Sequence, residues 1–116
     1  MKVKRIVANI ETKNTSRAQR FYSDILGLDI LMDMDWIATY GSTTKMTVQM
    51  SFMNEGGSGT PVPDLSIEVD DVAEAFKRMK KARFKIEYPL TEEPWGVRRF
   101  YVRDPFGRLI NILEHL

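Results

Sequence analysis

Apolar and polar residues alternate along much of this chain, a pattern that predicts β-strands with one buried and one polar face. The first stretch covers residues 4–12, in which Ile6, Ala8 and Ile10 share one side. Similar patterns predict further strands at residues 28–34, 36–40, 46–53, 64–69, 84–88, 98–103 and 109–113. Residues 89–96, which contain two prolines and a glycine, are expected to form a loop.

Two helices are expected between these strands. Asn14 or Thr15 can cap the first helix, and Gly27 can end it. Asp71 can cap the second helix, and Glu74 stands where a capping box requires it. Apolar residues recur at helical spacing in both: Ala18, Phe21, Tyr22 and Ile25 in the first, and Val72, Ala75, Phe76 and Met79 in the second.

The order of strand, helix and three strands therefore occurs twice, which predicts an α+β domain of two βαβββ modules. Module one covers residues 1–53, module two covers residues 64–116, and the Gly- and Pro-containing stretch 54–63 links them. The segment NIETKNTSRA at 9–18 aligns with SIEVDDVAEA at 66–75. Strand, cap and helix agree in phase, so we favour a duplication over two generic strand–helix units.

The predicted strands also define a polar face. Their apolar sides, which include Phe100 and Val102, are expected to form a core with the helices. The opposite side carries Asn9, Glu11, Gln49, Ser51, Asp64, Ser66, Glu68, Arg99, Tyr101, Arg103 and Asn111. Two interpretations are open: the polar face contacts solvent, or it lines a concave cleft in a curved mixed sheet whose convex side carries the helices.

Composition and charge exclude several classes of function. The 116 residues suffice for one domain, and a net charge of +1 with interspersed acids and bases gives no basis for binding nucleic acid or an anionic membrane. The chain has no cysteine, no apolar run of about 18 residues and no signal-peptide pattern. A cytoplasmic protein without disulfides is therefore expected.

Three motifs resemble those of the glyoxalase/bleomycin-resistance/dioxygenase superfamily, also called vicinal oxygen chelate proteins. They are NTSRAQRFYSDILGL at 14–28, DLSIEVDDVAEAFKRM at 64–79 and PWGVRRFYVRDPFGRLINILE at 94–114. Together they span nearly the whole chain. The resemblance implies a concave eight-stranded sheet with a cleft, and a homodimer formed by swapped or side-by-side modules.

The resemblance also implies positions for a divalent metal, which enzymes of that superfamily hold on the concave face. The matching positions are Val7, Gln49, Asp64 and Asn111. Valine cannot bind a metal, and amides are weak ligands for Zn²⁺, Ni²⁺ or Fe²⁺, so only Asp64 is a good ligand. Because a catalytic metal needs about three strong protein ligands, neither a metal nor another cofactor is expected. The single histidine, His115, is expected to be frayed at the chain end.

The resemblance then favours the metal-free, bleomycin-resistance-like branch, whose members sequester a drug without a reaction. Such a site needs flat aromatic surfaces and charges that suit an aromatic or cationic ligand, an antibiotic for example. The residues predicted to bind the ligand are Trp36, Tyr40, Gln49, Asp64, Glu68, Trp95, Arg99, Tyr101 and Asn111.

Several of these residues have other interpretations. Trp95 can pack within its loop, and Trp36, predicted to share a strand face with Tyr40, can lie in a dimer interface. Asp64 and Arg99 can pair with each other and serve the structure alone.

Two other functions stay open. One is a small lyase or isomerase in which Asp64 or Glu68 acts with Tyr101, since no histidine, cysteine or lysine is expected on the polar face. The other is an interaction module that binds a partner protein. Under the binding hypothesis the expected partners are a small molecule and a second copy of the chain.

Overall fold

The computed structural model describes residues 1–25, 27–42 and 49–116, apart from the side chain of Phe21. Residues 46–48 of one predicted strand, Met46 included, lie outside the described residues. The strands are β1 (Val3–Glu11), β2 (Asp29–Met34), β3 (Ile37–Gly41), β4 (Gln49–Met53), β5 (Leu65–Val69), β6 (Ile86–Glu93), β7 (Val97–Arg103) and β8 (Leu109–His115). The helical segments are η1 (Thr15–Arg17), η2 (Gln19–Ile25) and α1 (Val72–Lys81).

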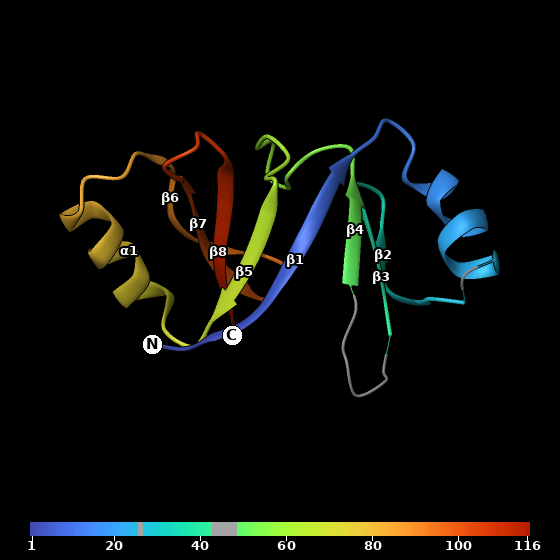
Figure 1. Ribbon diagram of the computed structural model, residues 1–116, viewed down its shortest axis with the longest axis horizontal. Helices are drawn as coiled ribbons and strands as arrows, with labels where there is room; N and C mark the ends of the chain where they lie inside the picture. Colours follow the sequence, from blue (N-terminus) through green and yellow to red (C-terminus); the bar gives the residue numbers. More distant parts are fainter. Residues whose placement is uncertain (26, 43–48) are drawn as a thin grey trace. The chain divides into compact units, whose positions relative to one another are not determined.

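The strands form a mixed sheet with the hydrogen-bonded order β2-β3-β4-β1-β5-β8-β7-β6 (Figure 1). The pairs β1–β4 and β5–β8 are parallel, and the other registered neighbours are antiparallel. In both halves of this order the first strand of a module pairs with its last strand. The predicted α+β class and mixed sheet are confirmed.

The chain divides into two compact units that do not follow the sequence order strictly. One unit contains residues 1–6 and 63–116, and the other contains residues 7–62. Strand β1 therefore contributes to both: its first residues belong to the unit of β5, and residues 8–11 pair with β4. We call the unit of residues 1–6 and 63–116 the α1 unit, because it contains α1, and the unit of residues 7–62 the η unit, because it contains η1 and η2.

The core of the α1 unit lies between α1 and the sheet. Phe100 and Val72 are fully buried, and the rings of Phe76 and Phe100 meet edge to face at 5.1 Å. Helix α1 begins as expected, because the Asp71 side chain accepts a hydrogen bond from the Glu74 N–H at 3.0 Å. The core positions predicted for Phe100 and Val102 are confirmed.

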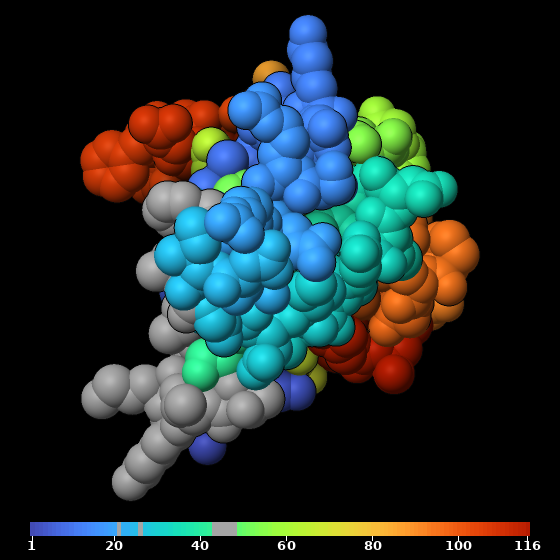
Figure 2. All heavy atoms as spheres, turned by 90° about the vertical axis from the view of Figure 1, so that its right-hand side faces the viewer, coloured from blue at the N-terminus to red at the C-terminus, as the bar shows by residue number. Residues whose placement is uncertain are grey.

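The η unit has a core of small and aromatic residues. Ala18, Ala38, Tyr40 and Phe52 are buried, and the ring of Tyr22 lies 4.8 Å from that of Phe52. Asn14 caps the helical region as predicted, but the region is a 3₁₀ turn followed by a π-helical segment. Figure 2 shows these segments beside β2. Ile25 at the end of η2 is exposed, as are Ile30, Leu31 and Met32 of β2.

Two predicted boundaries near the C-terminal end were wrong. The stretch expected to be a loop at 89–96 continues strand β6 as far as Glu93, with register shifts around Pro89. Strand β8 extends to His115, which pairs with Val97 and is not frayed. No helix in the described part of the chain is long and apolar enough to cross a membrane.

Candidate functional site

A row of polar side chains crosses the α1 unit on the face away from α1. Ser66, Asn111, Tyr101 and Tyr88 are successive cross-strand partners on β5, β8, β7 and β6. Residues directly opposite each other on neighbouring strands point to the same side of a sheet, so these four side chains share one face. The polar face predicted from alternation therefore exists here, and the structure adds Tyr88 to it.

Asn111 is the least satisfied member of this row. Its side-chain Nδ2 donates to Ser66 Oγ at 3.1 Å. Its Oδ1 is buried and has no hydrogen-bond partner among the described residues. Because an unmet buried acceptor costs about 1–3 kcal/mol, a donor from outside the described residues, such as a water molecule or a ligand group, would stabilise this atom.

Beside this row, aromatic rings surround Arg99. Its guanidinium carbon lies 5.0 Å from the ring centroids of Trp95 and Tyr101 and 5.3 Å from that of Tyr88. Its Nη1 donates to the Tyr101 hydroxyl at 3.1 Å, and its Nε lies 3.8 Å from Glu93 Oε1. We call Tyr88, Glu93, Trp95, Arg99 and Tyr101 the arginine cluster.

The β6–β7 hairpin assembles this cluster. Its turn places Trp95 between the two strands, and Gly96 has a φ of 88°, which glycine adopts without strain. The Tyr88 hydroxyl donates to Glu93 Oε1 at 2.6 Å, so the carboxylate joins a ring to the cation. The sequence did not predict Tyr88 and Glu93 as site residues, because both were assigned outside the polar face. The signal that could have indicated Glu93 is the position of this acid directly before the Pro-Trp-Gly turn.

Glu68 forms a second group on the same face. Its carboxylate contacts Arg5, Lys4 at 3.6 Å and His115 Nδ1 at 3.0 Å. Burial alone would raise the pKa of Glu68, but hydrogen bonds from His115 and Arg5, together with their charges, lower it below its ordinary value. Glu68 is therefore held as a carboxylate and is a weaker base than a free glutamate. The expectation that no histidine lies on this face was wrong.

Asp64 binds the backbone at the start of β8. Its Oδ2 accepts from the Leu109 N–H at 3.0 Å, and its own N–H donates to the Leu109 carbonyl at 2.8 Å. The carboxylate thus fixes the start of β8. The ion pair recorded for Arg99 is with Glu93, so the pair suggested between Asp64 and Arg99 is replaced by a different one.

The remaining predicted residues belong to the η unit. Tyr40 lies in its core with a tilted ring contact to Tyr22, and burial followed by the charges of Asp33 and Asp24 raises its pKa. Trp36 lies in the β2–β3 turn, not on the strand with Tyr40, and its carbonyl accepts from the Asn54 N–H at 3.1 Å. Gln49 is half-buried at the start of β4.

The residues at the expected metal positions do not fit a catalytic metal. Val7 offers only carbon atoms, the Asn111 amide is bonded to Ser66, and one oxygen of Asp64 binds a backbone N–H. A catalytic site needs about three strong ligands. Across residues 1–25, 27–42 and 49–116, no group of three His, Cys, Asp or Glu side chains could hold a metal ion.

Comparison with known proteins agrees with the fold. The model of the Glyoxalase/Bleomycin resistance protein/Dioxygenase superfamily matches residues 4–112. A search of curated proteins finds no significant match.

Solved structures from several bacteria are similar along almost their whole length. A Legionella pneumophila protein described as an NAD-dependent benzaldehyde dehydrogenase has a TM-score of 0.77 at 17% identity, covering 97% of this chain and 100% of the other. A Vibrio splendidus member of the superfamily has a TM-score of 0.67 at 20% identity, with 97% and 99% covered. Methylmalonyl-CoA epimerase from Mycobacterium tuberculosis has a TM-score of 0.68 at 16% identity, with 95% and 86% covered. At these identities the likeness concerns the fold alone.

Proposed function

Because the chain belongs to the Glyoxalase/Bleomycin resistance protein/Dioxygenase superfamily, we propose that it binds a small molecule on the polar face of the α1 unit without a metal. The ligand has a flat aromatic part and a cationic or other hydrogen-bond-donating group. The observation that carries this proposal is the buried Oδ1 of Asn111, which lacks a partner among the described residues. The resemblance to this superfamily also matches Asn111 to a metal-ligand position of its enzymes.

The arginine cluster supports the aromatic part of this ligand. Trp95 and Tyr88 are only half-buried, so each ring has area left for stacking beyond its contact with Arg99. Arg99 already carries a positive charge among these rings, so a cationic group is better placed at Asn111 Oδ1 than against the cluster. The proposed ligand therefore spans the two, with its ring at Trp95 and its donor at Asn111.

A thermal-shift screen of aromatic, cationic and glycopeptide antibiotics tests this function. A ligand at about one hundred times its Kd stabilises the folded state by about 2.7 kcal/mol, which a melting curve resolves easily. Binding should also change the fluorescence of Trp95. If no compound in such a panel stabilises the protein, the binding proposal loses its support.

Substitutions at Asn111 test the site. Asn111→Leu removes the acceptor and should lower the affinity for a compound found in the screen by about tenfold or more. Asn111→Asp keeps an acceptor oxygen and should still bind a cationic compound. Asn54→Leu, which removes an exposed amide of the η unit, is the matched control and should bind as the wild type does. Equal binding by wild type and Asn111→Leu would place the ligand elsewhere.

The pair of Glu68 and His115 favours a second candidate, a small lyase or isomerase. Glu68 has a lowered pKa and is a poor base, but it orients the ring of the half-exposed His115, which could move a proton. Incubation of carbonyl compounds with the protein in D₂O, followed by NMR, detects such proton exchange. Exchange that disappears in His115→Gln would favour the enzyme, and its absence throughout would favour binding alone.

A further inference from the structure

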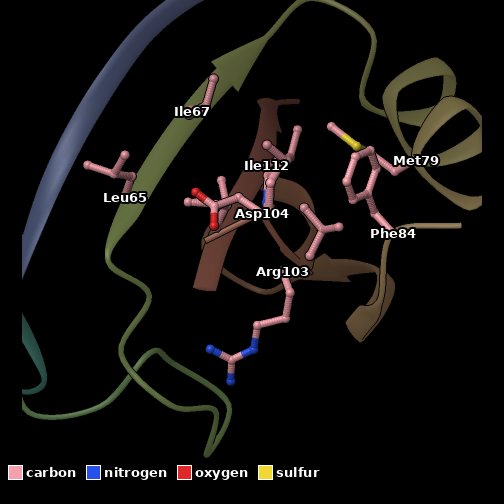
Figure 3. Close-up of a pocket in the computed structure, with 10 residues that line it drawn as sticks. Leu65, Ile67, Met79, Phe84, Arg103, Asp104 and Ile112 are labelled. Carbon is pink, nitrogen blue, oxygen red and sulfur yellow. The ribbon is translucent and has the colours of Figure 1, made fainter. Parts of the chain in front are cut away.

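The α1 unit has a pocket on the opposite face of its sheet, beside the end of α1. The pocket holds about 240 Å³ and is lined by Leu65, Ile67, Met79, Phe84, Val102, Arg103, Asp104, Pro105, Ile110 and Ile112 (Figure 3). Ile110 and Ile112 alternate with Asn111 along β8, so this pocket and the polar face lie on different sides of the sheet.

The pocket exists because α1 is shorter than the sheet it covers. Ten residues of helix extend about 15 Å, whereas the seven-residue strands β7 and β8 extend about 23 Å. The helix ends at Lys81, and Arg83 turns the chain away with a φ of 64°. Beside the end of the helix, the side chains of Leu65 and Phe84 are more than a third exposed.

Asp104 gives this apolar pocket a negative charge. Its Oδ1 accepts from the N–H groups of Phe106 at 2.8 Å and Arg108 at 2.9 Å. Its Oδ2 makes no hydrogen bond or ion pair in the described part of the chain. In Figure 3 the carboxylate is drawn among the apolar lining, between Leu65 and Ile112.

The other charged lining residue, Arg103, is engaged elsewhere, because it shares the carboxylate of Glu87 with Lys85, whose Nζ lies 3.2 Å from Oε1. Its Nε lies 3.3 Å from Glu87 Oε1, and its Nη1 donates to the Gly107 carbonyl at 3.0 Å. Its side chain extends away from the apolar group in Figure 3. The charged group drawn among the apolar lining is therefore the carboxylate of Asp104.

We propose that this pocket binds a small hydrophobic amine, with its ring or alkyl part against Ile67, Ile110 and Ile112 and its ammonium group at Asp104. Apolar cavities of about 150 Å³ are known to take up benzene, so this larger pocket has room for one ring and a short chain. Burial of the ring supplies affinity, and the carboxylate selects a cation over a neutral or anionic relative. This site is independent of the one at Asn111.

NMR titration with three probes that share a phenyl ring and a two-carbon chain but differ in the terminal group tests the proposal: phenethylammonium, neutral ethylbenzene and anionic 3-phenylpropanoate. With labelled isoleucine methyl groups, phenethylammonium should shift the signals of Ile67, Ile110 and Ile112 at millimolar concentration. Ethylbenzene should bind more weakly, and 3-phenylpropanoate weakest. If none of the three probes shifts these methyl signals, the pocket is not a binding site.

Two variants separate the charge from the cavity. Asp104→Asn keeps an oxygen for the two backbone N–H groups but loses the charge. It should therefore weaken the binding of phenethylammonium by about tenfold and leave the affinity for ethylbenzene unchanged. Asp35→Asn, an exposed acid in the β2–β3 turn, is the charge-matched control and should change neither.

Leu65→Phe fills the entrance of the pocket and should weaken the binding of both phenethylammonium and ethylbenzene. Equal affinity of wild type and Asp104→Asn for phenethylammonium, or a preference for 3-phenylpropanoate, would overturn the assignment of an amine. Ligands found for the Asn111 site should keep their affinity in Leu65→Phe, so failure of either proposal leaves the other open.

Discussion

The arginine cluster contains a buried ion pair whose strength can be measured by removing one charge. Glu93→Gln keeps the shape of the side chain and its acceptor for the Tyr88 hydroxyl. The side chains of Arg99 and Glu93 are 3% and 1% exposed, and Nε and Oε1 lie 3.8 Å apart. At this distance and an effective dielectric of about 20, two unit charges attract each other by about 4 kcal/mol.

The expected loss is somewhat smaller than this attraction. Breaking a buried pair typically costs about 3–5 kcal/mol because one charge is left uncompensated. Here three aromatic rings still stabilise the guanidinium after the substitution. We therefore expect Glu93→Gln to lower the free energy of unfolding by about 3 kcal/mol, which lowers the melting temperature by roughly 12 °C for a chain of this size.

Urea unfolding followed by circular dichroism measures this effect. Glu92→Gln, at the exposed neighbouring position, is the control and should change the free energy of unfolding by less than about 0.5 kcal/mol. The double variant Glu93→Gln/Arg99→Met removes both charges of this pair and should be closer to wild type than Glu93→Gln alone. If Glu93→Gln matches Glu92→Gln, or if the double variant is the least stable, the reasoning is refuted.

Three further predictions concern other elements. The pKa of Glu68 is lowered from 4.5, so its stabilising contribution is complete above pH 4.5 and is lost as pH falls through the lowered pKa. The free energy of unfolding should therefore fall more steeply below pH 4.5 for wild type than for Glu68→Gln. Parallel curves for the two proteins would contradict this. The pKa of Tyr40 is raised from 10.0, so the unfolded chain ionises first and stability is lost above pH 10.0; Tyr40→Phe should reduce that loss, and coincident alkaline curves would exclude it. Asp71→Ala removes the acceptor 3.0 Å from the Glu74 N–H and should cost about 1 kcal/mol in urea unfolding, whereas Asp71→Asn should not; equal stability of the two variants would show that the cap is not important.

Local patterns were sufficient to predict most elements. The alternation on β7 and β8 is regular because one side must contact α1, so it also assigned Arg99, Tyr101 and Asn111 to the other side. The start of α1 was equally clear, because a cap depends on residues only three positions apart. In both cases the pattern that carries the prediction lies within a few residues of the sequence.

Strand β6 was not predictable in the same way. Pro89 and the irregular alternation around it indicate the end of a strand, yet β6 continues to Glu93. A proline is tolerated there because β6 is the last strand in the order, where one side of the strand needs no partner. The position of a strand within the sheet cannot be read from its own residues.

The partners within the candidate site also depend on distant segments. Glu68 was predicted on the polar face, but its contacts with Arg5 and His115 join residues 63 and 47 positions apart. Similarly, Tyr88 and Glu93 approach Arg99 only because of the register of the β6–β7 hairpin. Sequence reasoning identified the face, and the register determined which charges neutralise one another on it.

Because of strand β1, the compact units of the fold differ from the two modules of the sequence. Residues 1–6 precede the η unit, yet they belong with residues 63–116 and bring Lys4 and Arg5 to Glu68. A fragment cut at the linker would leave Glu68 with His115 alone of these three basic neighbours. The α1 unit becomes one continuous segment only in a circular permutant that starts at residue 7, where residues 1–6 would follow Leu116. A genetic rearrangement that keeps the α1 unit intact must therefore keep residues 1–6 together with residues 63–116, and a cut at the linker alone does not do this.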